Sequence, residues 1–172
     1  REARNDLAAE RAIELADQAA QGLSSDRLSP QNLNLQQRKA DLLRLKGDWD
    51  EAEQAALKLE SLAEEMGESE ALVLALRIQA QCAFEHGHYE QASDLALRAQ
   101  VVAQDGQNIE QAIHCELLLG MIFGAQSHWD QAITFYQAAL KRINSHCPQS
   151  HELQGECLFH LGMVHQERGE LS

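Results

Sequence analysis

The sequence predicts an all-α fold in which antiparallel helix pairs stack into an elongated array. Ala, Leu, Gln and Glu dominate the 172 residues and Pro occurs only twice, a composition that favours helices. Val, Ile and Thr are too sparse for a sheet protein. A ten-residue pattern also recurs at an interval of forty residues. A period of roughly 20–50 residues is typical of stacked units that cannot bury their apolar faces alone.

Three copies of the repeated segment can be read directly from the chain. They are GDWDEAEQAA from Gly47, GHYEQASDLA from Gly87 and SHWDQAITFY from Ser127. An alanine recurs at one position of these three copies, and another alanine lies forty residues before the first of them. An aromatic residue precedes the alanine by three residues in each of the three copies. These residues are Ala12, Ala52, Ala92 and Ala132, and Trp49, Tyr89 and Trp129. Because the rings recur at equal spacing, we expect them to lie in the core.

Each copy reads as the junction between two helices. The stretch QQRKADLLRLK before Gly47 has leucines spaced for one helical face. Gly47 then ends the first helix, since glycine adopts the left-handed conformation at little cost. A second helix begins near Trp49, with Asp50 in its first turn, where a carboxylate interacts favourably with the helix dipole. We expect the same arrangement in the next two copies.

Small residues recur where the two helices of a pair would face each other. The first helices carry Ala40, Ala80, Gly120 and Gly162, and the second helices carry the repeated alanines. Small side chains at matching positions allow two helix backbones to approach closely, which predicts tight hairpins.

This combination of small residue, turn glycine, aromatic ring and alanine resembles the tetratricopeptide repeat. The segment LLLGMIFGAQSHWDQAITFYQAAL is the copy most similar to that motif. The common repeat has about 34 residues, and this longer unit is similar to the variant of maltose-activator-type regulators, kinesin light chains and polarity adaptors. The resemblance implies a right-handed superhelix of antiparallel helix pairs, an α-solenoid.

The repeat predicts the internal organisation of a single domain. We expect one helix of a preceding repeat, three complete repeats and the first helix of a further repeat. Their ranges are 1–23, 31–66, 69–105, 109–144 and 150–172. The chain begins without Met and ends within a repeat, so we expect it to be a piece of a longer protein.

Charge and composition restrict the partners and the compartment. Fourteen basic residues stand against 27 acidic ones, a net charge of −13, and the basic residues form no stripe. Such a surface repels phosphate groups, so nucleic acid and anionic membranes are not expected partners. A neutral or basic protein or peptide is expected instead. Four cysteines without CxxC spacing predict reduced, packed thiols in a cytoplasmic protein.

The resemblance also implies a ligand-binding groove on the concave face, lined by the first helix of each pair. The implied groove residues are Gln37, Asp41, Arg44, Arg77, Gln81, Phe84, Leu117, Met121, Phe159 and Met163. The groove would be polar at one end and apolar at the other. Arg44 and Arg77 would supply charge-assisted hydrogen bonds. A terminal carboxylate beside Asp41 would be repelled, so we expect no carboxylate clamp of the kind found in chaperone-tail binders.

The sequence predicts no catalytic residue, no metal and no cofactor, and therefore no enzyme. Cys147, His151, Cys157, His160 and His165 lie close together, but structural zinc sites show tighter and more regular spacing. Cys157 also aligns with Cys115 and Ala75 in earlier copies, which indicates a packing series. No phosphate-binding glycine motif or triad order appears.

The function that we expect is a protein- or peptide-binding scaffold within a larger cytoplasmic signalling or regulatory protein. One alternative is a ligand-sensing or autoinhibitory domain of a transcription regulator or ATPase. Another is self-association through the last helix, which lacks a hairpin mate and should expose apolar surface.

Overall fold

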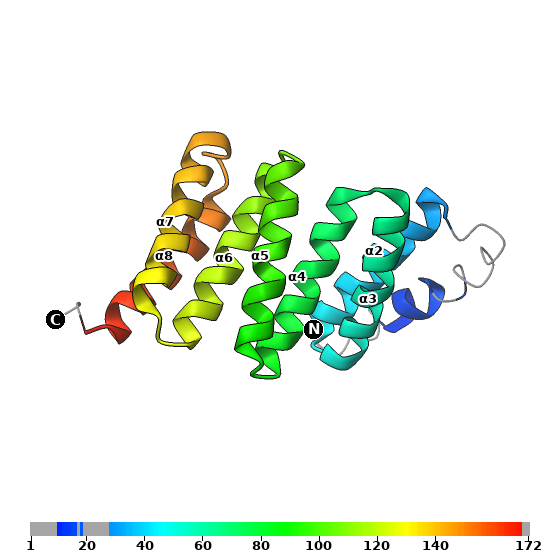
Figure 1. Cartoon of the computed structure of the whole chain (residues 1–172), viewed down its shortest axis with the longest axis horizontal. Helices are drawn as coiled ribbons and strands as arrows, with labels where there is room; N and C mark the ends of the chain where they lie inside the picture. The colour runs from blue at the N-terminus through cyan, green and yellow to red at the C-terminus, as the bar shows by residue number, and fades with distance from the viewer. Residues whose placement is uncertain (1–9, 17, 19–27, 170–172) are drawn as a thin grey trace.

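The computed structural model describes residues 10–16, 18 and 28–169, and these residues contain no strand. From residue 28 to residue 169 the chain forms seven helices in a row (Figure 1). They are α2 (Pro30–Lys46), α3 (Trp49–Met66), α4 (Ser69–Glu85), α5 (Tyr89–Asp105), α6 (Ile109–Ala125), α7 (Trp129–His146) and α8 (His151–Glu167). None of the described helices combines the length and apolar character needed to cross a membrane.

The helices stack as hairpins with a distinct inner and outer layer. Each helix packs against the next along the chain, and α2 contacts α4, α4 contacts α6, and α6 contacts α8. No such contacts join α3 to α5 or α5 to α7 in the described part of the chain. The even-numbered helices therefore lie closer together than the odd-numbered ones, which places them on the concave face of the solenoid.

The predicted repeats can be compared with these hairpins. Repeat 31–66 contains α3 and all of α2 except Pro30, repeat 69–105 contains α4 and α5, and repeat 109–144 contains α6 and most of α7. Helix α8 lies within 150–172. Residues 10–16 and 18 of the predicted first helix are helical, and the rest of 1–23 lies outside the described residues.

The turn inside each hairpin has the left-handed residue that the sequence predicts. Gly47 has φ 82° and its N–H donates to the carbonyl oxygen of Arg44 at 3.1 Å. Gly87 has φ 77°, and Ser127 adopts the same conformation with φ 60° although it has a side chain. The helix after each of these turns has an acidic residue in its first turn, as predicted.

The predicted core position of the recurring rings is wrong in one respect. Trp49, Tyr89 and Trp129 are only half-buried. Each ring lies on the first residue of its helix, beside the exposed turn. Trp49 packs against the outside of the cluster between α2, α3 and α4 rather than in its centre. Trp129 packs at the margin of the cluster between α6, α7 and α8.

Tyr136 is the large ring at the centre of that cluster. It is 1% exposed, and it lies directly over Gly120 of α6. A Cβ atom at Gly120 would lie 2.6 Å from Cε1 and from Cζ of the Tyr136 ring. Glycine at position 120 therefore allows α6 and α7 to approach this closely, as the series of small residues predicts.

Candidate functional site

The inner face of the solenoid contains a polar cavity of ≈630 Å³ between α2, α4, α6 and α8. Its walls combine charged side chains from α2 and α4 with apolar side chains from α6. Six of the predicted groove residues line it, namely Asp41, Arg44, Arg77, Gln81, Leu117 and Met121. Residues from three successive repeats thus meet at one place, because the first helices of the repeats are adjacent on the concave face.

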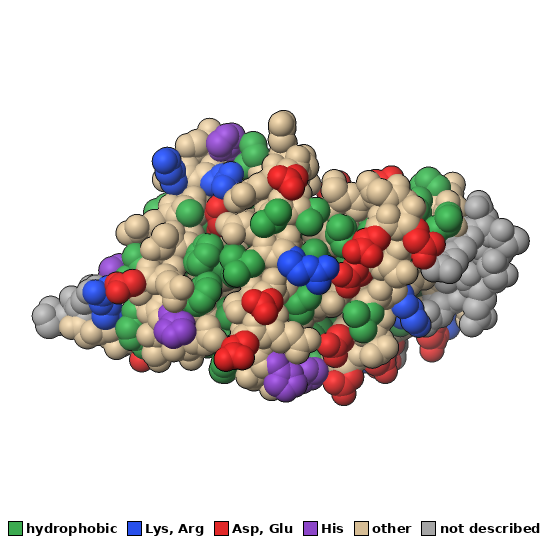
Figure 2. Space-filling view, viewed as in Figure 1, with side chains coloured by type: hydrophobic (Ala, Val, Ile, Leu, Met, Phe, Trp, Pro, Cys, Tyr) green, Lys and Arg blue, Asp and Glu red, His purple; other side chains and the backbone are tan. Residues whose placement is uncertain are grey.

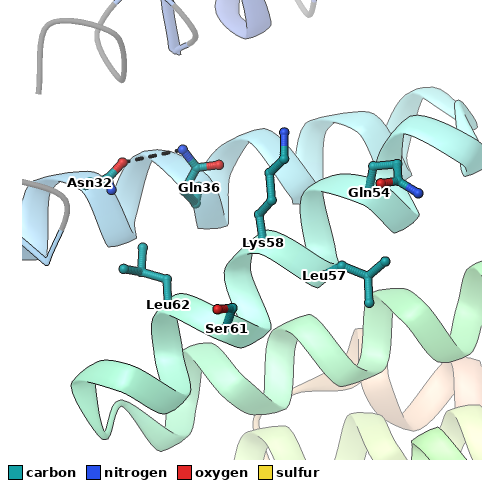
Figure 3. A pocket seen from close by; sticks show the side chains of 7 residues that line it. All are labelled: Asn32, Gln36, Gln54, Leu57, Lys58, Ser61 and Leu62. Carbon is teal, nitrogen blue, oxygen red and sulfur yellow. Dashed lines mark hydrogen bonds between the residues drawn. The ribbon is translucent and has the colours of Figure 1, made fainter. Parts of the chain in front are cut away.

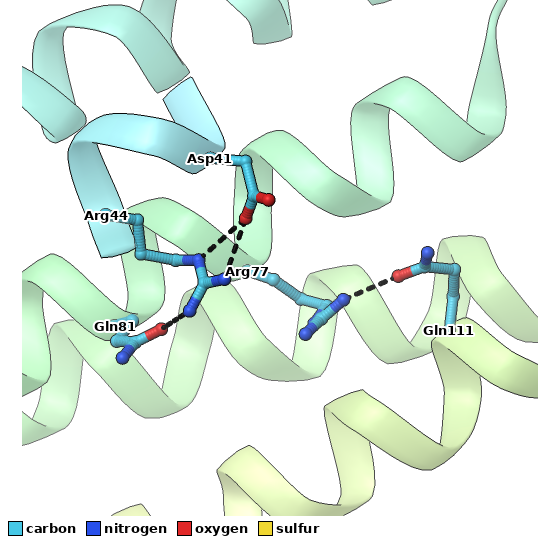
Figure 4. Close-up of polar contacts among 5 residues, drawn as sticks. All are labelled: Asp41, Arg44, Arg77, Gln81 and Gln111. Carbon is cyan, nitrogen blue, oxygen red and sulfur yellow. Dashed lines mark hydrogen bonds and ion pairs between the residues drawn. The ribbon is translucent and has the colours of Figure 1, made fainter. Parts of the chain in front are cut away.

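Arg44 forms a compact polar cluster at one side of this cavity (Figure 4). Its Nη2 and Nε donate to Oδ1 of Asp41 at 2.7 and 3.0 Å, one helical turn away on α2. Its Nη1 donates to Oε1 of Gln81 on α4 at 3.5 Å. The charges of Arg44 and Asp41 therefore largely offset each other within α2.

Arg77 on α4 is bound very differently. Figure 4 shows its side chain pointing away from Arg44 and toward α6, where Nη1 donates to Oε1 of Gln111 at 2.7 Å. Gln111 is neutral, and no carboxylate among the described residues lies within ion-pair distance of this guanidinium. The Nε atom is buried and has no hydrogen-bond partner there. Burial, more than the nearby positive charge of Arg44, lowers the pKa of Arg77 from its usual value.

His114 on α6 lines the same cavity and is held neutral at physiological pH. Loss of hydration lowers its pKa to about 4, and the positive charges of Arg77 and Arg44 add to that effect. The imidazole contributes a donor and an acceptor to the cavity but no charge at pH 7.

The part of the cavity formed by α8, which packs on α6 and makes no contact with α4, is acidic. Glu152 and Glu156 lie one turn apart on α8, and both are exposed. Neither forms an ion pair with another described residue. The cavity therefore presents a guanidinium on one side and two carboxylates on the other.

A smaller apolar cavity of ≈300 Å³ adjoins this region through Met121, which lines both. Phe84 and Met163 line it as well, together with Trp129 at the start of α7. The ring of Phe84 contacts that of Tyr89 at a centroid distance of 5.6 Å. Apolar walls of this kind suit a buried aliphatic or aromatic side chain.

Two of the predicted groove residues line neither cavity. Gln37 is half-buried on α2, and Phe159 is 64% exposed on α8, where its ring meets His160 edge-on at 5.5 Å. The four polar residues that the prediction did not include are Gln111, His114, Glu152 and Glu156. Extending the predicted stripe by one or two helical turns toward each N-terminus finds them, since positions three to four residues apart share a helix face.

A further cavity of ≈440 Å³ lies between α2 and α3, and Figure 3 shows the residues around it. Its lining is mainly amide and aliphatic, and Gln36 Nε2 donates to Asn32 Oδ1 at 3.4 Å within α2. None of the predicted groove residues lines it. We therefore regard the concave face as the candidate site.

Among the cysteines and histidines near α8, Cys157 is packed in the core, as its place in the repeat predicts. Cys157 is buried, and its Sγ donates to the carbonyl oxygen of Tyr136 at 3.0 Å. Burial raises the pKa of this thiol to about 11, so it is protonated. In the described part of the chain, no three His, Cys, Asp or Glu residues are arranged to hold a metal ion.

The face of the molecule shown in Figure 2 is predominantly acidic. Acidic side chains are spread over this face and outnumber the basic ones, with apolar side chains between them. This agrees with the net charge of −13.

Comparison with known proteins identifies the fold. No protein-family model and no curated sequence matches the chain. Among solved structures, similar ones include a kinesin light chain-like protein of Podosopora anserina with nearly identical TPR-like repeats, at 15% identity and a TM-score of 0.72. BtubC from P. vanneervenii matches at 19% identity and a TM-score of 0.73, and the apo form of RapI at 12% and 0.76.

These matches extend over nearly the whole chain. They cover 95%, 96% and 95% of it, and they cover 80%, 66% and 72% of the respective solved chains. At such low identity the likeness concerns the fold alone, and in that respect it agrees with the contacts between the helices. The chain has the tetratricopeptide-like repeat fold, a right-handed α-solenoid of antiparallel helix pairs.

Proposed function

We propose that this chain is a peptide-binding module of a larger cytoplasmic signalling or regulatory protein, and that the ligand lies along the concave face. The observation that supports this most directly is the pair of adjoining cavities that share Met121. A polar cavity beside an apolar one provides orientation and buried contact area together, which is what recognition of a short peptide requires. Repeat solenoids with tetratricopeptide-like folds use such surfaces for protein interactions.

The charge of the cavity argues for a ligand that is neutral or basic overall. Two guanidinium groups and three carboxylates line it, and His114 is neutral. A strongly anionic segment would face the uncompensated Glu152 and Glu156. No residue is assigned a catalytic role in this proposal.

The proposal is tested with labelled dodecapeptide pools of random sequence, capped at both ends and biased to basic, neutral or acidic composition. Fluorescence anisotropy with the wild-type chain should show binding of the basic and neutral pools and weak binding of the acidic pool. Met163→Gln, which places an amide in the apolar cavity, should weaken binding about tenfold.

Leu97→Gln is the matched control for that variant. Leu97 lies on α5 and is exposed to a similar degree, 39% against 46% for Met163. This variant should bind as the wild type does. Absence of binding by every pool would contradict the proposal, and equal losses in both variants would contradict the position of the groove.

A second candidate is self-association through α8, and one observation favours it. Leu158, Phe159 and Met163 are all large apolar residues that α8 exposes, between 46% and 64%. Association of two copies through this face would remove apolar surface from water. Sedimentation velocity at several protein concentrations distinguishes it, because peptide binding alone leaves the chain monomeric.

A further inference from the structure

Placing Arg77 in this cavity costs free energy, because its guanidinium is not fully hydrogen-bonded. A guanidinium carries five N–H donors and cannot lose its charge under ordinary conditions. In this cavity only Nη1 has a partner among the described residues, and that partner is the neutral Gln111. A buried charged donor that lacks an acceptor loses hydration without compensation, which is costly. The site is therefore set up to accept a hydrogen-bond acceptor from a ligand, with a negative charge on it being most favourable.

The expected repulsion from Asp41 is offset in the structure. Both donor bonds from Arg44 converge on Oδ1 of Asp41, so that carboxylate already has a cation beside it. Asp41 and Arg44 act on Arg77 with opposite sign, and Arg77 points away from both toward Gln111. A ligand carboxylate that approaches Arg77 from the side away from Asp41 would therefore meet a guanidinium that has no carboxylate partner among the described residues.

The acidic wall supplies the complementary half of the site. Glu152 and Glu156 line the same cavity from α8 and have no cationic partner among the described residues. A doubly charged anion such as a phosphate would be repelled by this wall, since the lining already has more carboxylates than cations. A ligand with one negative and one positive group matches both walls.

As an extension of the proposed function, we propose that the polar cavity recognises a zwitterionic segment of the peptide. Arg77 binds a carboxylate of the ligand, and Glu152 and Glu156 bind an ammonium or guanidinium group of the same ligand. The cavity volume of ≈630 Å³ lies within the range that encloses small ligands. The carboxylate can belong to an Asp or Glu side chain or to a C-terminus, and peptides with capped or free C-termini distinguish these sources.

The first test uses sodium acetate as the minimal carboxylate and follows the arginine Nε–Hε signals in ¹H–¹⁵N spectra of the 172-residue chain. Acetate should shift the Arg77 signal saturably, because a carboxylate bound to the guanidinium in the cavity changes the surroundings of its buried and unpartnered Nε–Hε. The Arg44 signal is the internal control and should stay in place, because its Nε already donates to Asp41. An unmoved Arg77 signal, or an equal shift with sodium chloride at the same ionic strength, would overturn the carboxylate site.

The second test uses capped random octapeptide pools with two fixed residues, Asp with Arg, Asn with Arg, or Asp with Gln. The wild type should bind the Asp–Arg pool about tenfold more tightly than either other pool. Arg77→Gln should remove the preference for Asp, and Glu152→Gln with Glu156→Gln should remove the preference for Arg. Arg38→Gln, which removes the same charge from an exposed position of α2 outside this cavity, should retain both preferences.

A further pool with Asn and Arg fixed and a free C-terminus identifies the source of the carboxylate. If it binds as tightly as the capped Asp–Arg pool, a terminal carboxylate suffices, and if it does not, the side chain is required. Binding of all pools with equal affinity would leave the peptide groove intact and overturn the zwitterion site. Binding of none would overturn the proposed function, while the acetate titration would still decide the role of Arg77.

Discussion

Helices α6 and α8 share several aligned residues of the repeat but have very different surroundings. A shift of 42 residues aligns Cys115 with Cys157 and Gly120 with Gly162. Helix α6 contacts α4, α5, α7 and α8, whereas α8 contacts only α6 and α7 among the described helices. Both aligned cysteines are buried, but a Cβ atom at Gly120 would clash with a ring and one at Gly162 would meet nothing within 4 Å.

The repeat pattern specifies which residues can pack, and the neighbouring helix decides which of them do. Gly120 is required because Tyr136 of α7 covers it. The corresponding face of α8 is not covered by any described helix, so its glycine has no such role.

Replacing the ring that covers α6 should have the largest effect. Tyr136→Ala removes a fully buried side chain from the cluster between α6, α7 and α8, and should lower the free energy of unfolding by about 3–5 kcal/mol. Phe159→Ala, which removes an exposed ring from α8, should cost less than about 1 kcal/mol. Urea denaturation of both variants measures the difference, and similar losses would contradict the assigned packing.

Adding one methyl group to each aligned glycine should separate the two helices more selectively. Gly120→Ala forces a Cβ to within 2.6 Å of a buried ring and should cost about 1–3 kcal/mol. Gly162→Ala meets open space in a helix and should leave stability unchanged or raise it by up to about 1 kcal/mol. Thermal denaturation of the two variants side by side checks the sign, and a stabilising Gly120→Ala would show that α7 does not lie this close.

The sequence pattern predicts the positions of the helices much better than it predicts the contacts in the candidate site. Gly47, Trp49 and Ala52 lie next to one another along the chain, so local turn geometry and periodicity are enough to predict the hairpin. The depth of each ring is not local, because it depends on how far the neighbouring hairpin extends over it. This is why Trp129 was expected in the core and is half-buried, while Tyr136 occupies the centre.

The candidate site depends even more on contacts between repeats. Arg77 and Gln111 are 34 residues apart, and their hydrogen bond follows from the relative register of α4 and α6. A forty-residue period does not specify that register. The positions of Glu152 and Glu156 likewise depend on how α8 packs against α6. The sequence alone does not specify that packing.

Among the groove residues, His114 on α6 should make stability depend on pH. The pKa of His114 is lowered to about 4 in the folded chain from 6.5, first by burial and then by Arg77 and Arg44. Protonation therefore favours the unfolded state, so its contribution is complete above about pH 6.5 and is lost as the pH falls toward 4. We expect a loss of roughly 1–3 kcal/mol over this interval.

The measurement compares urea denaturation of the wild type and of His114→Gln at pH 7.5 and pH 4.5. The variant should lose less stability on acidification, by about the amount assigned to the histidine. Glu156→Gln, at the aligned and exposed position of α8, is measured beside it as the matched control. Identical pH dependence of His114→Gln and the wild type would show that the imidazole is not buried beside the two arginines.

We expect the smallest effect on stability from a substitution at Leu158 of α8, which aligns with Glu116 of α6. Glu116 of α6 is buried and bound by Arg142 of α7, with Nη2 and Oε1 2.9 Å apart, whereas the aligned Leu158 of α8 is 54% exposed. Leu158→Glu adds a charge at a solvated position and should change the free energy of unfolding by less than about 0.5 kcal/mol. Sedimentation velocity should show less self-association for this variant than for the wild type if α8 is the associating surface, since like charges would then meet across the interface. A loss of stability above about 1 kcal/mol would mean instead that Leu158 is packed against another part of the chain, and that α8 is covered in the same way as α6.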